Sequence, residues 1–524
     1  MSLRKWFENL LHRIKALKRE SLSRAAPFPS KTASPTRSTA PAVPKVQSDV
    51  LRRKLTKVVV VGIDFGTSGT KIVIGDTTTQ RHYLLSNPER PQRDPSFVFP
   101  SIVHIRDNRA FFCAGAANGN KRADAEFNSF KVCLACQHGL ASCRGCAHRG
   151  ETPGLFLFPN LMGVDQLEAE QIATFYLAFV IGYSKREIER RWGDEFVLKP
   201  LFNIGAPIDQ WNAQRGSEVF TRVAFYGEKL SAAVLDGAPL VDLLTAYKRM
   251  KAEYPRIPPE AERVVFVQPE TAAGLMSFVT SPRAATGLYG IVDVGAGTTD
   301  VSFFRLADFN PDEPRRMSFY DAKTDVVGAG DFDRSLARLA VSRLPSLNRN
   351  VVEENSPEML SAARSAKETL GITAGCEIRF ATGTVKLSRA EVEASFTPII
   401  TQMVRTYVET NHRAYEKEKL VNRWETFTVM TLGGGTKCLP VYNALRTTYP
   451  STYNKKITFA RIPIPTDIDC DSSARDNFEL VAVAYGLSFP PPDFPEILST
   501  SAVSPIDFTL PAKNGPDRDE LYPK

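Results

Sequence analysis

The sequence predicts an α/β protein with two related lobes, on the basis of three observations. A chain of 524 residues is too long for one small hydrophobic core. Residues 58–61 are four consecutive valines, a composition typical of a strand buried on both faces of a sheet. The pattern of residues 58–75, a buried strand, a polar turn and a second strand, returns at 290–304. Such an internal echo indicates a duplicated lobe.

The composition excludes some classes of protein. Hydrophobic residues make up 43% of the chain and charged residues 24%, which is ordinary for a soluble globular protein. No apolar run approaches the roughly 20 residues that a membrane span needs. The net charge of +8 is concentrated in residues 1–57, which hold 14 Lys and Arg against 3 Asp and Glu. The remaining chain is close to neutral, so the folded body carries no nucleic-acid signature.

The first element in chain order is a basic amphipathic helix, predicted for residues 1–20. Its apolar residues recur at helical spacing, with basic residues mostly elsewhere around the helix. Its partner is an anionic membrane surface, an acidic groove of another protein, or its own body. Residues 21–56 are rich in Ser, Thr, Pro and Ala and predict a disordered linker. No secretory signal is visible, so we expect a cytoplasmic protein, or one peripheral at a membrane.

The first hairpin, residues 58–75, predicts a site for a phosphate. Its turn, Asp64-Phe65-Gly66-Thr67-Ser68, offers backbone N–H groups and hydroxyls beside a carboxylate. A carboxylate repels a phosphate unless a metal ion lies between them, so the pair suggests a magnesium nucleotide. Taken alone, the stretch is equally compatible with an ordinary hydrophobic hairpin.

Between the two hairpins the sequence predicts five further elements. These are a strand pair at 97–105, a long helix at 165–192 capped by Asp165, a strand at 201–206, a helix at 212–223 and a strand at 264–267.

The second hairpin strengthens the nucleotide hypothesis. It again places an aspartate, Asp293, before a turn of glycine and threonine. Two such hairpins facing each other could hold the two sides of one polyphosphate. A third turn, Gly433-Gly434-Gly435, follows a predicted strand at 426–430 and precedes a predicted helix at 440–446. A ligand approaching backbone at a helix N-terminus is a common use of such a turn.

With these motifs in this order, the chain resembles the actin-like ATPase superfamily. Within it, the chain is most similar to the ATPase domain of the DnaK-like seventy-kilodalton heat-shock chaperones. Further segments carry the same resemblance: 212–215, 327–333, 366–370 and 482–486. It implies a two-lobed actin-like fold of duplicated ribonuclease-H-like lobes, over 57–285 and 286–488, with a Cys-rich insertion at 131–150 and a Pro-rich, mostly coil-like tail at 489–524.

The resemblance also implies roles for individual residues. Asp64 would hold the water shell of Mg²⁺, Asp293 would direct the attacking water, and Lys131 would offset charge on the transferred phosphoryl group. Glu270 would reach the metal region. The phosphates of ATP or ADP would contact Gly66, Thr67, Ser68, Gly295, Ala296, Gly297 and Thr298, with Asp300 near the metal. The Gly328 turn belongs to the same nucleotide site, and the nucleoside would contact Lys367, Arg364, Gly433, Gly434 and Gly435.

The chain departs from the family pattern in several places. The acid at Glu270 is displaced by one position, and Glu368 stands where the family has an adenine-stacking arginine. Arg364, one helical turn earlier, could substitute. Gly435 replaces a serine and Ala296 a glycine. After Gly486 only 38 residues remain, so we expect no peptide-binding domain.

Four cysteines, Cys133, Cys136, Cys143 and Cys146, form two C-x₂-C knuckles in 14 residues. Four thiolates match tetrahedral Zn²⁺ and leave no open position, so we expect a structural zinc knuckle. An iron–sulfur cluster and unligated or redox-active thiols are the alternatives, and His138 and His148 are spare ligands. The scattered Cys113, Cys376, Cys438 and Cys470 are expected in the core.

The predicted function is a chaperone-like switch that binds and slowly hydrolyses Mg-ATP. It would open and close two lobes and act through protein partners. Those partners would bind the N-terminal helix and the Cys-rich insertion. The alternatives are a nucleotide-binding scaffold with weak turnover, a filament-forming actin-like ATPase, and a sugar-kinase-like phosphotransferase. The partner and the cellular process cannot be derived from the residues.

Overall fold

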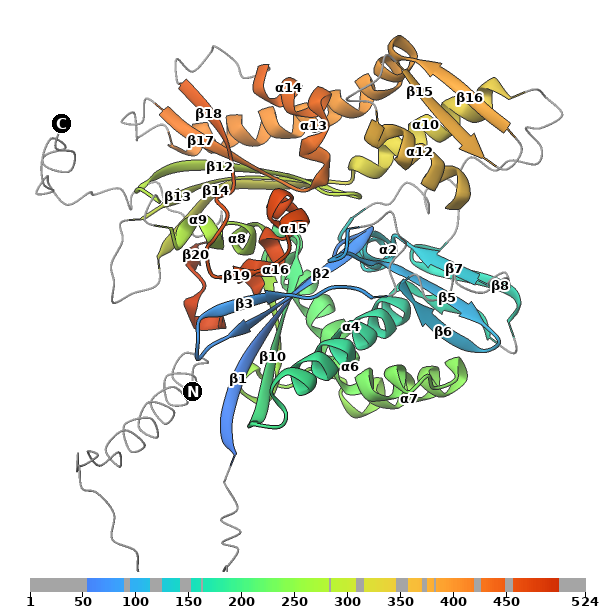
Figure 1. Ribbon diagram of the computed structural model, residues 1–524, viewed down its shortest axis with the longest axis vertical. Coiled ribbons are helices and arrows are strands. Elements are labelled where there is room, and N and C mark those ends of the chain that lie inside the picture. The colour runs from blue at the N-terminus through green and yellow to red at the C-terminus, as the bar shows by residue number, and fades with distance from the viewer. Residues whose placement is uncertain are drawn as a thin grey trace, which may run out of the picture.

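The computed structural model describes residues 54–88, 95–113, 125–141, 152–161, 164–281, 284–307, 315–344, 357–369, 375–380, 383–418, 426–447 and 456–498. The predictions for residues 1–20, for most of 21–56, for Cys143 and Cys146, and for 499–524 lie outside these ranges. Two large sheets dominate the described part, with helices packed around them (Figure 1). The predicted α/β class is confirmed. No helix in these ranges is long and apolar enough to cross a membrane.

The first sheet has seven strands, in the order β11-β10-β1-β2-β3-β19, with β4 paired to β2. Strands β1, β10 and β11 are parallel to one another, whereas β2 is antiparallel to β1 and to β3. The bounds are β1 Leu55–Asp64, β2 Gly69–Asp76, β3 Arg81–Leu84, β4 Phe99–Pro100, β10 Phe196–Ala206, β11 Val265–Pro269 and β19 Ile468–Asp469.

The second sheet has six strands, in the order β18-β17-β12-β13-β14-β20. Its strands are β12 Gly287–Val294, β13 Thr299–Leu306, β14 Arg316–Asp325, β17 Thr426–Leu432, β18 Lys456–Arg461 and β20 Glu496–Leu498. Strands β12, β17 and β18 are parallel, and β13 is antiparallel to both β12 and β14. Five strands of each sheet therefore share one order and one set of directions, which is the structural counterpart of the echo in the sequence.

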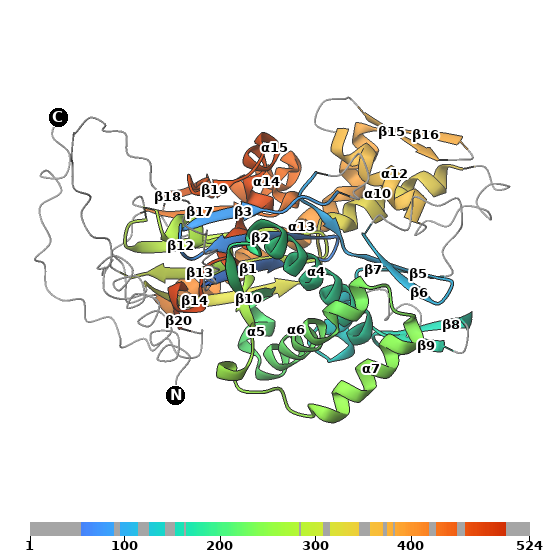
Figure 2. The same ribbon diagram turned by 60° about the horizontal axis from the view of Figure 1, so that its bottom comes forward.

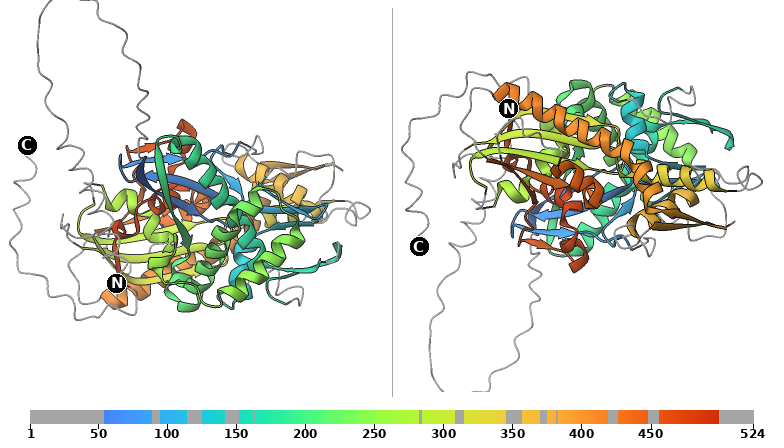
Figure 3. Two further views of the ribbon diagram at one scale, coloured as in Figure 1. Left: turned by 90° about the horizontal axis from the view of Figure 1, so that it is seen from below. Right: turned by 90° about the horizontal axis from the view of Figure 1, so that it is seen from above.

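Helices cover each sheet. In the first half of the chain α4 Ala169–Trp192, α6 Gln214–Leu235 and α7 Leu240–Glu253 pack together beside β10 and β11 (Figure 2). In the second half, α10 Ala329–Arg343 and α14 Leu439–Thr447 contact α13 Arg389–Glu418, which runs along β13 and β14, and α12 Pro357–Thr369 packs on α10 (Figure 3). The shorter helices are α2 Phe130–Gln137, α5 Ile208–Asn212, α8 Glu270–Gly274, α9 Met276–Val279, α15 Ser472–Asp476, α16 Ala482–Leu487 and the 3₁₀ turns η2 Glu260–Glu262, η3 Gly434–Lys437, η5 Phe478–Leu480 and η6 Pro491–Asp493.

The predicted start of the long helix at Asp165 is wrong. Residues 164–168 form β9 Val164–Glu168, which pairs with β8 Leu155–Leu161. The helix begins at Ala169, where Glu168 and Gln171 make a reciprocal capping box. The strand pairing takes the residues that the sequence pattern assigned to the first helical turn. Two further small sheets are β5 Ile102–Arg106 with β6 Arg109–Phe112 and β7 Ala125–Asn128, and β15 Gly375–Phe380 with β16 Gly383–Ser388.

The last described segment returns to the first sheet. Helix α16 packs against β1, β2 and α8, and a Cβ at Gly62 or Gly75 would run into its backbone or into Ser488. The side-chain amide of Asn203 on β10 donates to the carbonyls of Leu487 (2.7 Å) and Phe489 (2.8 Å). Beyond it, β20 pairs with β14 at the sheet edge, which adds a short strand within the stretch expected to be mostly coil from residue 489.

The valines at 58–61 are 0–4% exposed, which confirms the predicted buried strand. Val59 and Val61 belong to the apolar cluster between the first sheet and its helices, and a separate cluster fills the corresponding interface of the second sheet. A third cluster, which includes Leu432 and residues of α16, lies between the two sheets. Burial of this apolar surface stabilises the packing of the two sheets against each other, beside the place where their polar turns meet.

Candidate active site

Three of the carboxylates predicted for the site lie at or directly after the ends of parallel strands, and the fourth, Asp300, lies near the start of the antiparallel strand β13. Asp64 ends β1, and Glu270 directly follows β11, two strands away in the same sheet. In the second sheet Asp293 is next to last in β12, and Gly433 follows β17. Since the carboxyl ends of parallel strands meet at one edge of a sheet, each sheet gathers its polar residues at one edge.

The two hairpin turns touch each other. A Cβ placed on Gly297 would lie 2.8 Å from the methyl carbon of Thr67 and 2.9 Å from its hydroxyl. A small cavity opens beside this contact, lined by Thr67, Thr298, Lys131 and Gln210 among others. The structure therefore brings both turns to one place, as two facing hairpins require.

In the first hairpin the carboxylate is paired with a cation. The ammonium of Lys71 lies 3.0 Å from Oδ2 of Asp64 and donates to it. The turn itself is held by Ser101, whose hydroxyl donates to the carbonyl of Gly66 (2.7 Å) and whose N–H donates to the carbonyl of Ser68 (3.1 Å). Of the predicted phosphate contacts in this turn, Ser68 is the most exposed.

Lys131 and Glu270 form a second pair. Their Nζ and Oε1 atoms are 2.5 Å apart, and the ammonium lies 5.7 Å from the centre of the Phe65 ring. Burial and the nearby charges of Asp64 and Asp300 raise the pKa of Glu270 to about 7, against the opposing effect of Lys131. Burial alone would lower the pKa of Lys131, but the charge of Glu270 raises it.

The second hairpin opposes two carboxylates. Asp293 pairs with Asp300 across β12 and β13. Asp300 accepts hydrogen bonds from the hydroxyls of Thr298 (2.9 Å) and Thr324 (2.5 Å). Burial, followed by the charges of Asp300 and Glu270, raises the pKa of Asp293 well above its usual range. Burial also raises the pKa of Asp300, although the two threonines oppose this.

The carboxylates of Asp64, Asp293, Asp300 and Glu270 are the oxygen donors that this site offers to Mg²⁺. Within the described residues, no group of three or more His, Cys, Asp or Glu side chains converges closely enough to hold a metal ion directly. Yet the charges of Asp64 and Asp300 add to burial in raising the pKa of both Asp293 and Glu270, so the two lysines leave negative charge unbalanced. Magnesium keeps several waters and binds through one or two carboxylates plus substrate phosphates. The residues fit that arrangement better than an all-protein cage.

The Gly433 turn lies against the second hairpin. Gly433 has φ +74°, and a Cβ there would collide with the carboxylate of Asp293 and the backbone of Val294. Only glycine combines this backbone conformation with so close an approach. Gly435 likewise contacts Val294.

The Gly328 turn is tied to the phosphate turn of the second hairpin. The N–H groups of Ala329 and Gly330 donate to the carbonyls of Gly295 and Ala296, both at 2.8 Å. Lys367 on α12 bonds to this region, with its ammonium 3.1 Å from the carbonyl of Ala329 and 2.6 Å from Asp333. Arg364, by contrast, is exposed on α12, and the side chain of Glu368 lies outside the described residues.

Three polar residues of this region were missed by sequence reasoning. Lys71 and Thr324 contact Asp64 and Asp300, respectively, and Gln210 lines the cavity. Cross-strand position would have identified two of them, because Lys71 is paired with Asp64 and Thr324 with Asp300. Nothing in the sequence around Gln210 marks it as a site residue.

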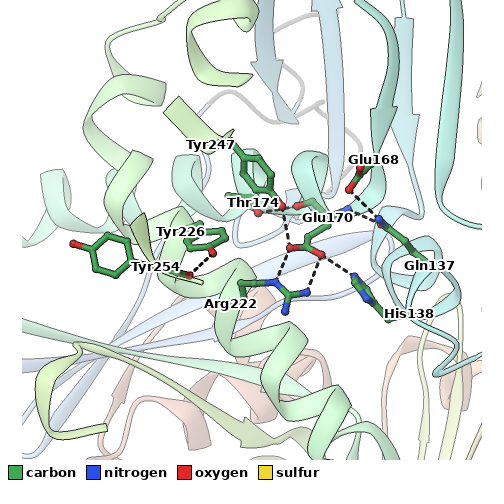
Figure 4. A network of polar contacts seen from close by, with 9 residues as sticks. All are labelled: Gln137, His138, Glu168, Glu170, Thr174, Arg222, Tyr226, Tyr247 and Tyr254. Carbon is green, nitrogen blue, oxygen red and sulfur yellow. Dashed lines mark hydrogen bonds and ion pairs between the residues drawn. The ribbon is translucent and has the colours of Figure 1, made fainter. Parts of the chain in front are cut away.

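Helix α2, which carries Lys131, is fixed by a buried polar network around Glu170 (Figure 4). Oε2 of Glu170 lies 2.8 Å from Nε2 of His138, at the C-terminal end of α2, and its carboxylate accepts two hydrogen bonds from Arg222 at 2.7 and 2.9 Å. Tyr247 donates a further one at 2.9 Å. Burial alone would raise the pKa of Glu170, but His138 and Arg222 hold it far below its usual range. Cys133 and Cys136 lie on this anchored helix.

Comparisons with known proteins give a distant and partial likeness. No family model matches the chain. A curated protein named chaperone protein HscA homolog, from Pseudomonas paraeruginosa, is 26% identical over 166 residues, and proteins of the same name from two strains of Pseudomonas aeruginosa are 25% identical over 166 residues. Each match covers 31% of this chain and 25% of the relative. The chain therefore spans about a quarter of the length of the curated relatives it matches, and the relationship to these chaperones is a loose one.

Proposed function

We propose that this chain binds Mg-ATP between its two hairpins, hydrolyses it, and uses the change to shift its two lobes, 57–285 and 286–488, relative to each other. The observation that carries the proposal is the contact between the two Asp-Gly-Thr hairpins, with carboxylates from both sheets and two lysines around it. The partial similarity to HscA chaperones supports the same reading, since proteins of that kind are ATPases. The activity is expected to be slow.

Each predicted residue then has a role that its contacts support. Asp64, with Lys71, would anchor the water shell of Mg²⁺, which supplies charge neutralisation at the phosphates when it is bound. Backbone N–H groups of Gly66–Ser68 and Gly295–Thr298 would bind phosphate oxygens. Lys131 would exchange part of its pairing with Glu270 for the transferred phosphoryl group. Lys367 and the Gly433–Gly435 turn would hold the nucleoside, with Arg364 beside the base.

The reaction is the transfer of the γ-phosphoryl group to water. The water oxygen bonds to the γ-phosphorus, and the bond from that phosphorus to the β–γ bridging oxygen breaks with its electron pair leaving on ADP. The proton of the water passes to Asp293 and then to the phosphate released. A raised pKa makes the ionised carboxylate a stronger base than an ordinary aspartate, which suits it to accept the proton of the water.

The nucleotide would act as a switch because it would bridge two sheets that otherwise meet through an apolar cluster. Opening or closing at that junction would be recognised by protein partners. The N-terminal helix, residues 1–20, and the Cys-rich insertion are the proposed docking elements, with a membrane surface as the alternative contact of the helix.

We further propose a structural Zn²⁺ bound by Cys133, Cys136, Cys143 and Cys146. Its support is the spacing of the two knuckles and the position of the first pair on anchored helix α2. Metal analysis of the purified chain beside a Cys133→Ser/Cys136→Ser variant tests it. One zinc per wild-type chain, lost in the variant, is expected, and a metal-free wild type would remove the proposal.

The function is tested by ATP binding and turnover of the wild type beside Asp293→Asn and Lys131→Ala. We expect Mg-dependent binding by all three and much slower turnover by both variants. A wild type that binds no adenine nucleotide with Mg²⁺ would contradict the proposal. Binding with a turnover rate that Asp293→Asn leaves unchanged would favour a nucleotide-binding scaffold. Pelleting with ATP would favour a filament-forming ATPase, and phosphate transfer to a sugar would favour a kinase.

A further inference from the structure

Gln210 is a buried polar residue at the candidate site whose side chain is not satisfied by the protein. It lies on α5, directly after β10 and Pro207, and is 7% exposed. Its side-chain oxygen has no hydrogen-bond partner among the described residues. A buried polar atom without a partner is destabilising, so its presence calls for an explanation other than folding.

The location of this side chain suggests what it serves. Gln210 lines the small cavity between the two turns, together with Thr67 of the first hairpin, Thr298 of the second and Lys131 of α2. Several other buried side-chain atoms in the described ranges also lack a partner, among them those of Ser277 and Ser302. None of their residues lines this cavity. At Gln210 alone the unsatisfied atom and the proposed phosphate site coincide within the described part of the chain.

The backbone around Gln210 is closely fitted, so the side chain has a defined origin. The indole N–H of the next residue, Trp211, donates to the carbonyl of Val267 on β11 at 3.2 Å. A Cβ at Gly216, on α6, would run into the backbone of Gln210, which shows how closely α5 and α6 approach. An apolar side chain of similar size would fill the same space without an unsatisfied oxygen. Packing alone therefore gives no reason for a carboxamide here.

We propose that Gln210 positions the water that attacks the γ-phosphoryl group, an inference that rests on the proposed function and deepens it. A carboxamide can accept a hydrogen bond from a water and donate one to a phosphoryl oxygen at the same time. Glutamine fulfils this orienting role in other phosphoryl-transfer enzymes. In the step written above, the water oxygen bonds to phosphorus, the proton goes to Asp293, and the bridging bond breaks toward ADP. Gln210 gains and loses no proton and acts only by orientation.

The test compares wild type with Gln210→Leu and Gln210→Met, which keep the bulk of the side chain and remove the amide. Single-turnover hydrolysis and the Kd for Mg-ATP are measured on the full chain, together with the melting temperature. We expect hydrolysis to slow by about 10- to 100-fold, with the Kd changed by less than about threefold. The melting temperature should be unchanged or higher, because an unsatisfied buried atom has been removed. A purely structural residue would not separate rate from affinity in this way.

Gln214→Leu is the matched control, since Gln214 is an exposed glutamine four residues away whose amide bonds to Glu218 at the surface. It should hydrolyse ATP at the wild-type rate. If Gln210→Leu folds poorly, the hydrolysis rate and Kd of Gln210→Met are compared with those of wild type instead. Wild-type hydrolysis by a folded Gln210 variant would overturn the role of Gln210 and leave the proposed function standing. A wild type that binds Mg-ATP but does not hydrolyse it, or does not bind it, would overturn the proposed hydrolysis and this inference together.

Discussion

The two hairpins share a strand order and a turn sequence but differ in the charge that faces the leading aspartate. In β1–β2 the residue paired with Asp64 is Lys71, an ammonium. In β12–β13 the residue paired with Asp293 is Asp300, another carboxylate. A duplicated backbone thus carries one balanced pair and one repulsive pair. The residue that faces each aspartate across its hairpin, rather than the turn motif itself, therefore decides which role that aspartate can take.

Because of this difference, the two aspartates are suited to different roles in the proposed reaction. An aspartate already paired with a cation is suited to hold a hydrated metal at a fixed place. Burial and an opposing second carboxylate raise the pKa of the other aspartate, so its ionised form is a stronger base for the proton of the water.

The largest effect is expected for Asp293→Asn. Amide substitution removes the proton acceptor while keeping the shape of the side chain, so single-turnover hydrolysis should fall by about 10²- to 10⁴-fold. The metal-free protein should be as stable as wild type or more stable, because a repelled carboxylate has been neutralised. Rapid-quench hydrolysis and urea unfolding measure the two quantities. An unchanged hydrolysis rate would end the assignment of the proton to the second hairpin.

Lys131→Met comes next. It removes the ammonium that would stabilise the transferred phosphoryl group, so turnover should fall by about 10²-fold. It also leaves Glu270 without its partner, and the pKa of Glu270 should rise further, because Lys131 now lowers it. The control is the double variant Lys131→Met/Glu270→Gln, which should recover stability without recovering turnover. Recovery of both in the double variant would show that Lys131 acts only by balancing Glu270.

Lys71→Met makes the first hairpin resemble the second by removing its cation. We expect the Kd for Mg-ATP to rise about tenfold, because a charge-assisted contact beside the phosphates is lost. Hydrolysis of bound ATP should change less than in Asp293→Asn. Titration calorimetry and single-turnover rates separate the two effects. A rate loss as large as that of Asp293→Asn would remove the distinction between the hairpins.

The smallest effect is a pH dependence in the metal-free protein. Burial raises the pKa of Glu270 in the folded state to about 7, from 4.5 for the unperturbed side chain. The folded state therefore binds more protons than the unfolded state between these values, and this group contributes a loss of stability as the pH rises from 4.5 to 7. Unfolding in urea across this range should show a loss on the order of 1–3 kcal/mol in wild type relative to Glu270→Gln. Parallel curves for the two proteins would contradict the shift.

Much of the fold followed from the sequence, because its signals are local. The valines at 58–61 and the repeated turn at 290–304 predicted two buried central strands that the structure has. The start of the long helix failed because β9 pairs with the neighbouring strand β8 and takes the residues assigned to the first turn of α4. The pairing of β20 with β14, about 180 residues earlier, was not predicted, because a local pattern does not identify a distant partner.

The candidate site, too, could be predicted from the sequence only in part. The turns around Asp64 and Asp293 are contiguous motifs, so they could be found in the sequence. The pairing of Lys71 with Asp64 required the hairpin register, and the position of Gln210 required the packing of α5 on α6 and β11. The roles assigned to these residues, the zinc knuckle and the N-terminal helix stay predictions.

The central claim is that both hairpins hold one magnesium nucleotide, and titration calorimetry with ATP tests it most directly. Wild type is compared with Thr67→Val and Thr298→Val, one isosteric change in each turn, in Mg²⁺ and in EDTA. We predict one ATP per chain, binding that depends on Mg²⁺, and a Kd raised about fivefold or more by either substitution. Binding that is absent, that persists in EDTA, or that ignores one of the two threonines would contradict the claim.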